Sequence, residues 1–179
     1  MYQDIKSFKQ ITGFGGKSIF YIQVWHFVQN IMFCFSPQFM YGWRNFLLRI
    51  FGAKIGKGVR IRPSVKILHP WKLEIGNWTW IGDGVSLLSS CKISIGSNTV
   101  ISQNSYLAAG GHNYTKSTFD TVLAPITIED EVWIQTDVFI GPGVTIGFGT
   151  VVGYRSTVNK NLPSEMVCYG NPAKPIKPR

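Results

Sequence analysis

The chain has 179 residues, which is enough for one domain with a large core. Only 15% of its residues are charged, yet the formal net charge is +9, an excess that favours an anionic partner such as phosphates, a membrane surface or nucleic acid. Cys34, Cys91 and Cys168 are widely separated and show no CxxC spacing, which argues against a disulfide framework or a zinc site and fits a cytoplasmic location.

Residues 1–51 differ in composition from the rest of the chain. The segment 19–35 is strongly apolar and aromatic, but polar residues interrupt it, so it is a poor candidate for a membrane span or a signal peptide. A second helix is expected over about 39–51 and carries Arg44 and Arg49. We expect residues 1–51 to form a helical cap on the following domain, and their apolar, basic surface to contact the cytoplasmic face of a membrane. The two roles are compatible.

From residue 52 onward, aliphatic residues recur at every sixth position. Neither a helix nor a strand has this period, because their side-chain repeats are about 3.6 and about 2.0 residues. The pattern therefore predicts a chain that repeats a short strand and a turn, as in a parallel β-helix. Since three such steps close one triangular turn, residues 52–179 are expected to form about five coils and a C-terminal tail. The repeated positions are Ile55, Ile61, Ile67, Ile75, Ile81, Leu87, Ile95, Ile101, Leu107, Ile128, Ile134, Ile140, Ile146, Val152 and Val158.

Glycine often follows the repeated aliphatic residue, as at Gly56, Gly76 and Gly96. A corner in every six residues needs backbone conformations that glycine adopts without steric cost, so we expect these glycines to supply them. A β-sandwich would instead show alternation, with turns at intervals of about 8–12 residues. The sequence therefore favours an all-β prism over a sandwich.

The repeat is interrupted in three places. Two steps contain eight residues instead of six, and the extra residues near His69-Pro70 and near Ser89-Ser90 are expected to bulge outward, with His69 as a surface side chain. A step of twenty-one residues follows Leu107. This step predicts a loop inserted after the third coil, within residues 110–125.

His112 lies where the repeat stops, in the sequence Gly110-Gly111-His112-Asn113-Tyr114. The small residues before it would let another molecule approach closely, and imidazole can accept a proton from an alcohol near neutral pH. No GxSxG elbow occurs, and no Ser-His-Asp or Cys-His pairing is evident from the spacing. The pattern favours direct attack of an acceptor on a bound thioester, with His112 as general base and no protein nucleophile.

Several motifs resemble those of a known family. The six-residue repeat, the Gly-His-Asn-Tyr loop, the segment 126–134 and the ending 170–174 resemble the hexapeptide-repeat acyltransferases, which include maltose, galactoside and xenobiotic O-acetyltransferases. With the N-terminal segments included, nearly the whole chain is most similar to the O-acetyltransferases of colanic acid and related exopolysaccharide biosynthesis.

This resemblance implies a left-handed β-helix, although parallel crossovers are usually right-handed. It also implies a homotrimer, acetyl-CoA as co-substrate in the groove between neighbouring prisms, and no metal. The expected acceptor is a sugar hydroxyl of an exopolysaccharide or capsule repeat unit, free or as a lipid-linked oligosaccharide.

The resemblance further implies roles for single residues. His112 matches the general base, and Trp133 matches the tryptophan that lines the acyl and acceptor site across the subunit interface. Asp83 could orient His112, hold a sugar hydroxyl or be a solvated corner residue, and Asn113 is expected near the acceptor. The oxyanion donor is unassigned, and backbone N–H groups around Gly111 are candidates. The residues expected along the coenzyme groove are Gly111, Thr136, Gly153, Tyr154, Asn159, Lys160 and Lys174.

Other functions fit the sequence less well. A γ-class carbonic anhydrase needs histidines soon after the break, and none follows His112 there. Nucleic-acid binding lacks a helix-turn-helix, RNP or zinc pattern, and the basic residues are scattered. A xenobiotic or free-sugar O-acetyltransferase and a catalytically inactive β-helix scaffold stay open. The aromatic, basic N-terminus favours an exopolysaccharide enzyme over a xenobiotic or free-sugar acetyltransferase. A measurement of acetyl-CoA binding would distinguish an enzyme from an inactive scaffold.

Overall fold

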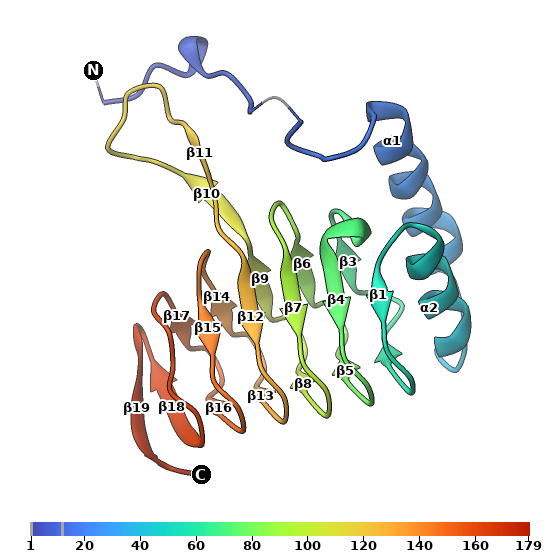
Figure 1. Ribbon diagram of the computed structural model, residues 1–179, viewed down its shortest axis with the longest axis vertical. Helices are drawn as coiled ribbons and strands as arrows, with labels where there is room; N and C mark the ends of the chain where they lie inside the picture. Colours follow the sequence, from blue (N-terminus) through green and yellow to red (C-terminus); the bar gives the residue numbers. More distant parts are fainter. Residues whose placement is uncertain (1, 12) are drawn as a thin grey trace.

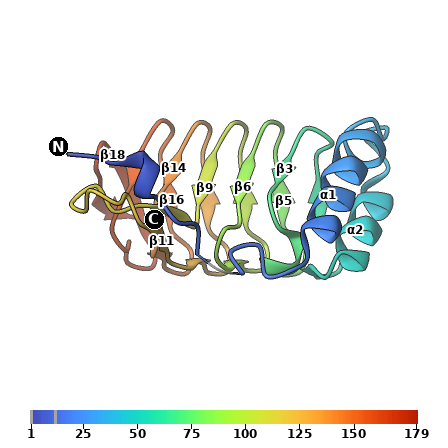
Figure 2. The same ribbon diagram turned by 90° about the horizontal axis from the view of Figure 1, so that it is seen from above.

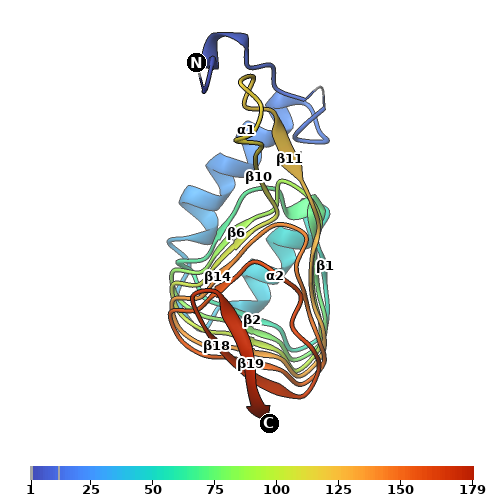
Figure 3. The same cartoon turned by 90° about the vertical axis from the view of Figure 1, so that its left-hand side faces the viewer.

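Three sheets of short strands, parallel except for the last strand, β19, form the walls of a prism in the computed structural model, which describes residues 2–11 and 13–179 (Figures 1 and 3). The first wall contains β1 (Lys54–Ile55), β4 (Leu73–Ile75), β7 (Ile93–Ile95), β12 (Ile126–Ile128) and β15 (Thr145–Ile146). The second wall contains β2 (Arg60–Ile61), β5 (Trp80–Ile81), β8 (Val100–Ile101), β13 (Trp133–Ile134), β16 (Val151–Val152), β18 (Met166–Gly170) and β19 (Ala173–Pro178). The third wall contains β3 (Lys66–Ile67), β6 (Ser86–Leu88), β9 (Tyr106–Ala108), β14 (Phe139–Ile140) and β17 (Thr157–Val158).

The core of the prism is a set of aliphatic columns. The chain visits the three walls in turn, and equivalent residues of successive coils pair in register, as Ile55 does with Ile75 and Ile75 with Ile95. All fifteen positions of the six-residue repeat are buried, each with at most 9% of its surface exposed. The predicted parallel β-helix of about five coils is therefore confirmed, and burial of these columns is its main stabilising term.

Glycine is needed after the repeat positions for a different reason from the one expected. None of Gly56, Gly76 and Gly96 has a positive φ; the left-handed residue lies two positions later, as at Gly58 and Asn98. A Cβ on Gly76 would instead lie 2.6 Å from the backbone nitrogen of the next coil. These glycines are required because adjacent coils approach closely, not because of their torsion angles.

The longer steps of the first two coils do not bulge into solvent. His69 is only 3% exposed, and Ser89 is fully buried. The Ser89 hydroxyl donates to the His69 carbonyl (3.0 Å) and accepts from the His69 backbone N–H (2.8 Å). Residues 13–16 cover this corner, where Trp71 Nε1 donates to Gly15 O (2.7 Å) and Lys72 Nζ donates to the carbonyl oxygen of residue 14 (2.7 Å). The prediction of a surface His69 is wrong because a distant segment packs on it.

The predicted insertion is present as an antiparallel hairpin. Strands β10 (Gly110–His112) and β11 (Thr121–Leu123) leave the prism after the third coil, at the corner between the third and first walls (Figure 1). The prism resumes at Ile126 with β12.

Two helices cover the open end of the first coil (Figure 2). These are α1 (Ile19–Val28), which continues into a π-helical turn (Gln29–Phe33), and α2 (Tyr41–Ile50); shorter 3₁₀ turns are Ile5–Ser7 and Pro70–Lys72. On the inner side of the cap, Trp25, Phe33 and Leu48 are fully buried. Trp25 Nε1 donates to Ile67 O (2.9 Å).

Both arginines of α2 donate to backbone carbonyls at this end of the prism, Arg44 from a buried position and Arg49 from an exposed one. The first coil has no preceding coil to pair with, so carbonyl groups at this end need other donors. Arg44 is fully buried and donates to Ile61 O (2.7 Å) and to acceptors in residues 36–38, while Arg49 donates to Ile55 O (2.9 Å). The expectation that Arg44 contributes to a membrane surface is therefore wrong.

Candidate active site

His112 is the last residue of β10 and pairs with Thr121 at the outer end of the paired strands of the β10–β11 hairpin. The imidazole stacks on Phe119, with ring centroids 4.3 Å apart and an interplanar angle of 7°. Its Nδ1 lies 2.9 Å from the Phe119 carbonyl oxygen. A carbonyl only accepts hydrogen bonds, so this contact selects the neutral tautomer with a proton on Nδ1. The Nε2 lone pair is thereby left to accept a proton.

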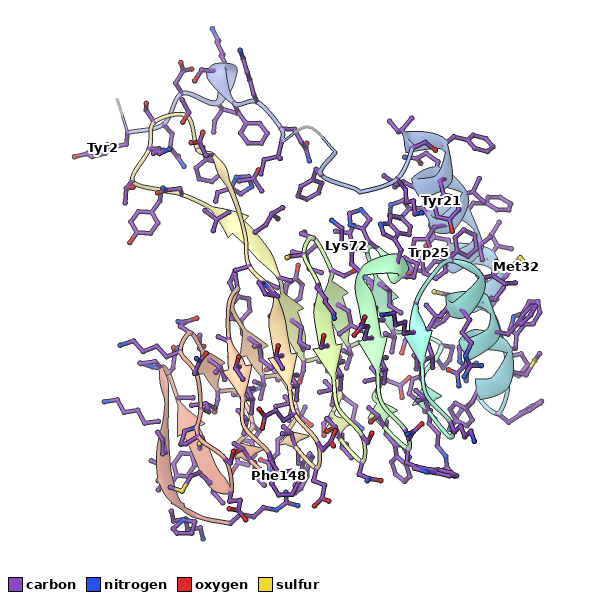
Figure 4. The ribbon with its side chains drawn as sticks, viewed as in Figure 1. Tyr2, Tyr21, Trp25, Met32, Lys72 and Phe148 are labelled. Atoms are coloured by element: carbon purple, nitrogen blue, oxygen red, sulfur yellow. The ribbon has the colours of Figure 1, made fainter. Side chains whose placement is uncertain are left out.

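The N-terminal segment also contacts this hairpin, which sequence reasoning missed. The backbone N–H of Asp4 donates to Ser117 O (2.7 Å), and the Phe8 ring meets the His112 ring edge to face at 5.6 Å. Tyr2 lies beside the same hairpin in Figure 4. Residues 2–11 therefore lie at His112 and not over the cap helices.

Asn113 uses its side chain inside the hairpin. Its Oδ1 accepts from the backbone N–H (2.9 Å) and the hydroxyl (2.6 Å) of Thr115, and its own N–H donates to Asp120 O (2.8 Å). The structure thus gives Asn113 a turn-forming role next to His112. A Cβ on Gly111 would have its nearest neighbour at 4.0 Å, so an incoming group could approach the backbone at this residue.

A hollow of about 740 Å³ lies along the corner between the second and third walls, and Trp133, Thr136 and Tyr154 line it. Trp133 Nε1 donates to Ser102 Oγ (3.0 Å), which fixes the indole, and 43% of this residue is exposed. Gly153 packs behind the hollow, since a Cβ there would lie 2.7 Å from Tyr169 Cβ. Trp133, Thr136 and Tyr154, which were predicted for the acyl site or the coenzyme groove, thus line one hollow. Gly153 lets Tyr169 pack closely beside it.

A second hollow, of about 370 Å³, continues along the same corner toward the cap and contains Asp83. Asp83 accepts from Arg62 Nε (2.6 Å) and Ser64 Oγ (2.7 Å). Burial alone would raise the pKa of Asp83, but these two hydrogen bonds hold it below its ordinary value. Asp83 is therefore an ionised partner of Arg62, and its contacts place it away from His112.

Other residues of this second hollow were missed by sequence reasoning. Trp80, Gln103 and Tyr41 of helix α2 line it, and Arg60 lies over the Trp80 ring at 4.9 Å. The sequence did contain a signal for Trp80. Trp80 and Trp133 each precede a repeated isoleucine, so both side chains are expected to point outward from the second wall. Only β8 lies between their strands. The contribution of Tyr41 could not be read from the repeat.

The three remaining residues of the predicted groove lie at the C-terminal end of the prism. Asn159, Lys160 and Lys174 line a hollow of about 430 Å³ between the end of the third wall and β19. The two ammonium groups make this end of the molecule a suitable place for phosphate groups. Among the described residues, no three His, Cys, Asp or Glu side chains gather in a way that could hold a metal ion.

His112 and Trp133 do not form one site within a single chain. His112 belongs to the hairpin that leaves the corner between the third and first walls, whereas Trp133 lies on the second wall (Figures 1 and 3). The third wall lies between the hairpin and the groove of Trp133.

Comparison with known proteins identifies the family, although no family model matches the chain. The sequence is 52% identical over 177 residues to the colanic acid biosynthesis acetyltransferase WcaF of Escherichia coli (strain K12), covering 99% of this chain and 97% of that protein. A galactoside acetyltransferase in complex with coenzyme A superposes with a TM-score of 0.83 at 25% identity, over 97% of this chain and 88% of that chain. The chain belongs to the hexapeptide-repeat acetyltransferases.

A third similar protein carries the co-substrate. The hexapeptide-repeat acetyltransferase of Vibrio cholerae O1 biovar eltor, complexed with acetyl coenzyme A, superposes with a TM-score of 0.79 at 25% identity, over 88% of this chain and 86% of that chain. The protein is thus an acetyltransferase that uses acetyl-CoA as co-substrate, on a left-handed β-helix as the motifs predicted. The colanic acid biosynthesis enzyme is similar to it over nearly the full length of both chains.

Proposed function

We propose that the enzyme transfers the acetyl group of acetyl-CoA to a sugar hydroxyl of an exopolysaccharide repeat unit, with His112 as general base. The observation that carries this proposal is the contact between His112 Nδ1 and Phe119 O (2.9 Å). It fixes the tautomer whose Nε2 can take the proton of an alcohol.

The reaction is a direct transfer. The acceptor oxygen attacks the thioester carbonyl carbon while its proton passes to His112 Nε2, and a tetrahedral oxyanion forms. The oxyanion collapses, the carbon–sulfur bond breaks, and the imidazolium returns the proton to the sulfur of coenzyme A. The products are an O-acetyl ester and the free thiol. A backbone N–H near Gly111 or the Gln103 side-chain amide is our candidate oxyanion donor.

The second hollow has the chemistry of a carbohydrate site. Trp80 offers an aromatic face on which a sugar ring can pack. Asp83 and Arg62 offer a charged acceptor and donors for sugar hydroxyls. Similarity to the colanic acid enzyme supports an exopolysaccharide acceptor. We therefore place the acceptor at Trp80 and Asp83, and the acetyl group near Trp133.

We further propose a homotrimer, in which the hairpin of one subunit reaches the groove of the next. The topology of one chain supports this arrangement. His112 belongs to the hairpin and Trp133 to the second wall, so a neighbouring subunit is needed to bring the two residues together. In the trimer, coenzyme A would extend along the intersubunit groove toward Lys160 and Lys174 at the C-terminal end.

Replacing His112 with alanine tests the proposal. Acetyl transfer should fall by at least ~100-fold, as expected for the loss of a general base, while acetyl-CoA binding measured by calorimetry stays within twofold of wild type. His26→Ala, which removes an imidazole from the cap, is the matched control and should retain full activity. Transfer by His112→Ala at the wild-type rate would remove His112 from the mechanism.

The acceptor is tested separately. Mass spectrometry of the polysaccharide from a producing strain, with and without the gene, should show the loss of one O-acetyl group per repeat unit. In the purified enzyme, Asp83→Asn should raise the KM for the glycan more than it lowers kcat. An unchanged polysaccharide, together with full activity on free sugars or xenobiotics, would favour one of those acceptors instead.

A further inference from the structure

The outer face of the cap exposes an unusual number of large apolar side chains. Besides Ile19 at the first position of α1, six residues of α1, α2 and the turn between them are each 52–83% exposed: Phe20, Phe27, Phe35, Phe39, Phe46 and Ile50. We refer to these six as the cap face. Soluble surfaces seldom present so many aromatic rings together, so this face suggests an interaction.

Contacts between the two helical segments of the cap support the cap face. Trp43 of α2 donates from Nε1 to Met32 O (3.1 Å) and stacks on Phe46, with ring centroids 5.9 Å apart. Figure 4 shows Met32 on the outer side of the cap and Trp25 toward the prism. Segment 18–43 contains no Lys, Arg, Asp or Glu, so no charged residue interrupts the face there.

Capping the prism does not account for the cap face. The inner side of the cap fills the open end with Trp25 and Leu48, and Arg44 supplies donors to the first coil. The six outer side chains contribute little to that closure, because more than half of each residue is exposed. Their apolar area therefore serves another purpose.

The charges of the chain are strongly segregated around this face. Residues 5–73, which include the cap and the first coil, contain eleven Lys and Arg and no Asp or Glu. Residues 74–179 contain seven Lys and Arg and eight Asp and Glu. Lys17, Lys57 and Lys66 are exposed at the N-terminus of α1 or on the first coil. Lys54 and Arg62 of the first coil are paired with Glu74 and Asp83 of the next coil, whereas Lys17, Lys57 and Lys66 form no ion pair with a described residue.

We infer that the cap face docks the enzyme on an anionic lipid surface. Phenylalanine and isoleucine side chains would enter the acyl boundary, while the surrounding cations meet lipid phosphates. A second copy of the chain is a poorer occupant, because two such faces would bring together the positive ends of both molecules. No helix in the described part of the chain is long and apolar enough to cross a membrane, so the cap would lie on the surface. This inference does not depend on the proposed acceptor.

Vesicle binding tests the inference with the full-length protein. The parent should co-sediment with phosphatidylcholine vesicles that contain phosphatidylglycerol, and binding should weaken several-fold without the anionic lipid or at high salt. Phe35→Ser/Phe39→Ser removes two rings that are 83% and 80% exposed, so the fold should survive. The apparent affinity of this variant should fall by about tenfold or more.

The matched control is Phe148→Ser, which removes an exposed phenylalanine from the corner between the first and second walls near the C-terminal end of the prism (Figure 4). This variant should bind vesicles like the parent. Acetyl transfer to a short soluble acceptor should be unchanged in both variants, which separates this test from the proposed reaction.

Two outcomes would overturn the inference. One is a parent that does not bind anionic vesicles, or a Phe35→Ser/Phe39→Ser variant that binds them equally well. The other is a parent that pairs its caps in solution, detected by sedimentation velocity as a doubled mass that the double variant loses.

Discussion

At the scale of single residues, His69 shows how a buried imidazole links stability to pH. It is 3% exposed, and burial together with the nearby Lys72 lowers its pKa from 6.5 to about 4, although its contact with Ser89 O (3.2 Å) acts in the opposite direction. The unfolded chain takes up a proton below pH 6.5 that the folded chain refuses until about pH 4. Stability is therefore lost as the pH falls through this window, by about 3 kcal/mol.

Urea unfolding at a series of pH values measures this loss. The free energy of unfolding of His69→Gln should depend less steeply on pH between 6.5 and 4 than that of the parent, because glutamine does not titrate. The same slope in both proteins would mean that other groups cause the acid sensitivity.

Lys174 is the residue whose charge tests the coenzyme end of the groove. Lys174→Glu should weaken acetyl-CoA binding by about tenfold or more, but should hardly affect a short acetyl thioester that lacks the nucleotide. Competition assays with both thioesters compare the two losses. Equal losses would show that Lys174 does not meet the coenzyme phosphates.

At the scale of elements, the cap holds the first coil closed through the buried cation of α2. Arg44→Ala would leave several backbone carbonyls without a donor and should destabilise the protein by about 3 kcal/mol. The midpoint of thermal unfolding should therefore fall by several degrees, whereas Lys57→Ala at an exposed position should leave it unchanged. A normal midpoint in Arg44→Ala would mean that water replaces the guanidinium.

The sequence predicts elements that depend on local patterns, but not the contacts between segments that are distant in the chain. The coils and the hairpin were predictable because a coil is set by a local six-residue pattern, and an insertion breaks that pattern at Leu107. The partners of Arg44 and His69 were not, because the repeat does not show that Arg44 meets Ile61, 17 positions away, or that His69 meets Ser89, 20 positions away. The contact between Phe8 and His112 was not predictable either, because the two residues are far apart in the sequence.

The candidate site was predictable to a similar extent. His112 could be found because it stands at the only long break in the repeat, and imidazole suggested its chemistry. The hollow around Asp83 could not, since it needs Tyr41 from the cap and Trp80 and Gln103 from successive coils. Asp83 itself turned toward Arg62 because the preceding coil places that guanidinium 2.6 Å away.

At the scale of the whole molecule, the proposed trimer makes function depend on how copies of the prism are arranged. The proposed general base and the proposed acyl groove lie on different sides of one chain, so each complete site would need two subunits. The basic, aromatic cap lies at one end of the prism, and threefold packing with parallel prisms would put three cap faces on the same side. Such an assembly would keep all its sites near one lipid surface.

Subunit mixing tests the shared site most directly. His112→Ala and Trp133→Ala proteins should each be strongly impaired, but co-expressed subunits should form hybrid trimers in which a neighbouring pair keeps an intact His112 and an intact Trp133. With random assembly, about a quarter of the sites and of the wild-type activity should return. If mass spectrometry confirms hybrid trimers and no activity returns, each site is built within one chain and the account is contradicted.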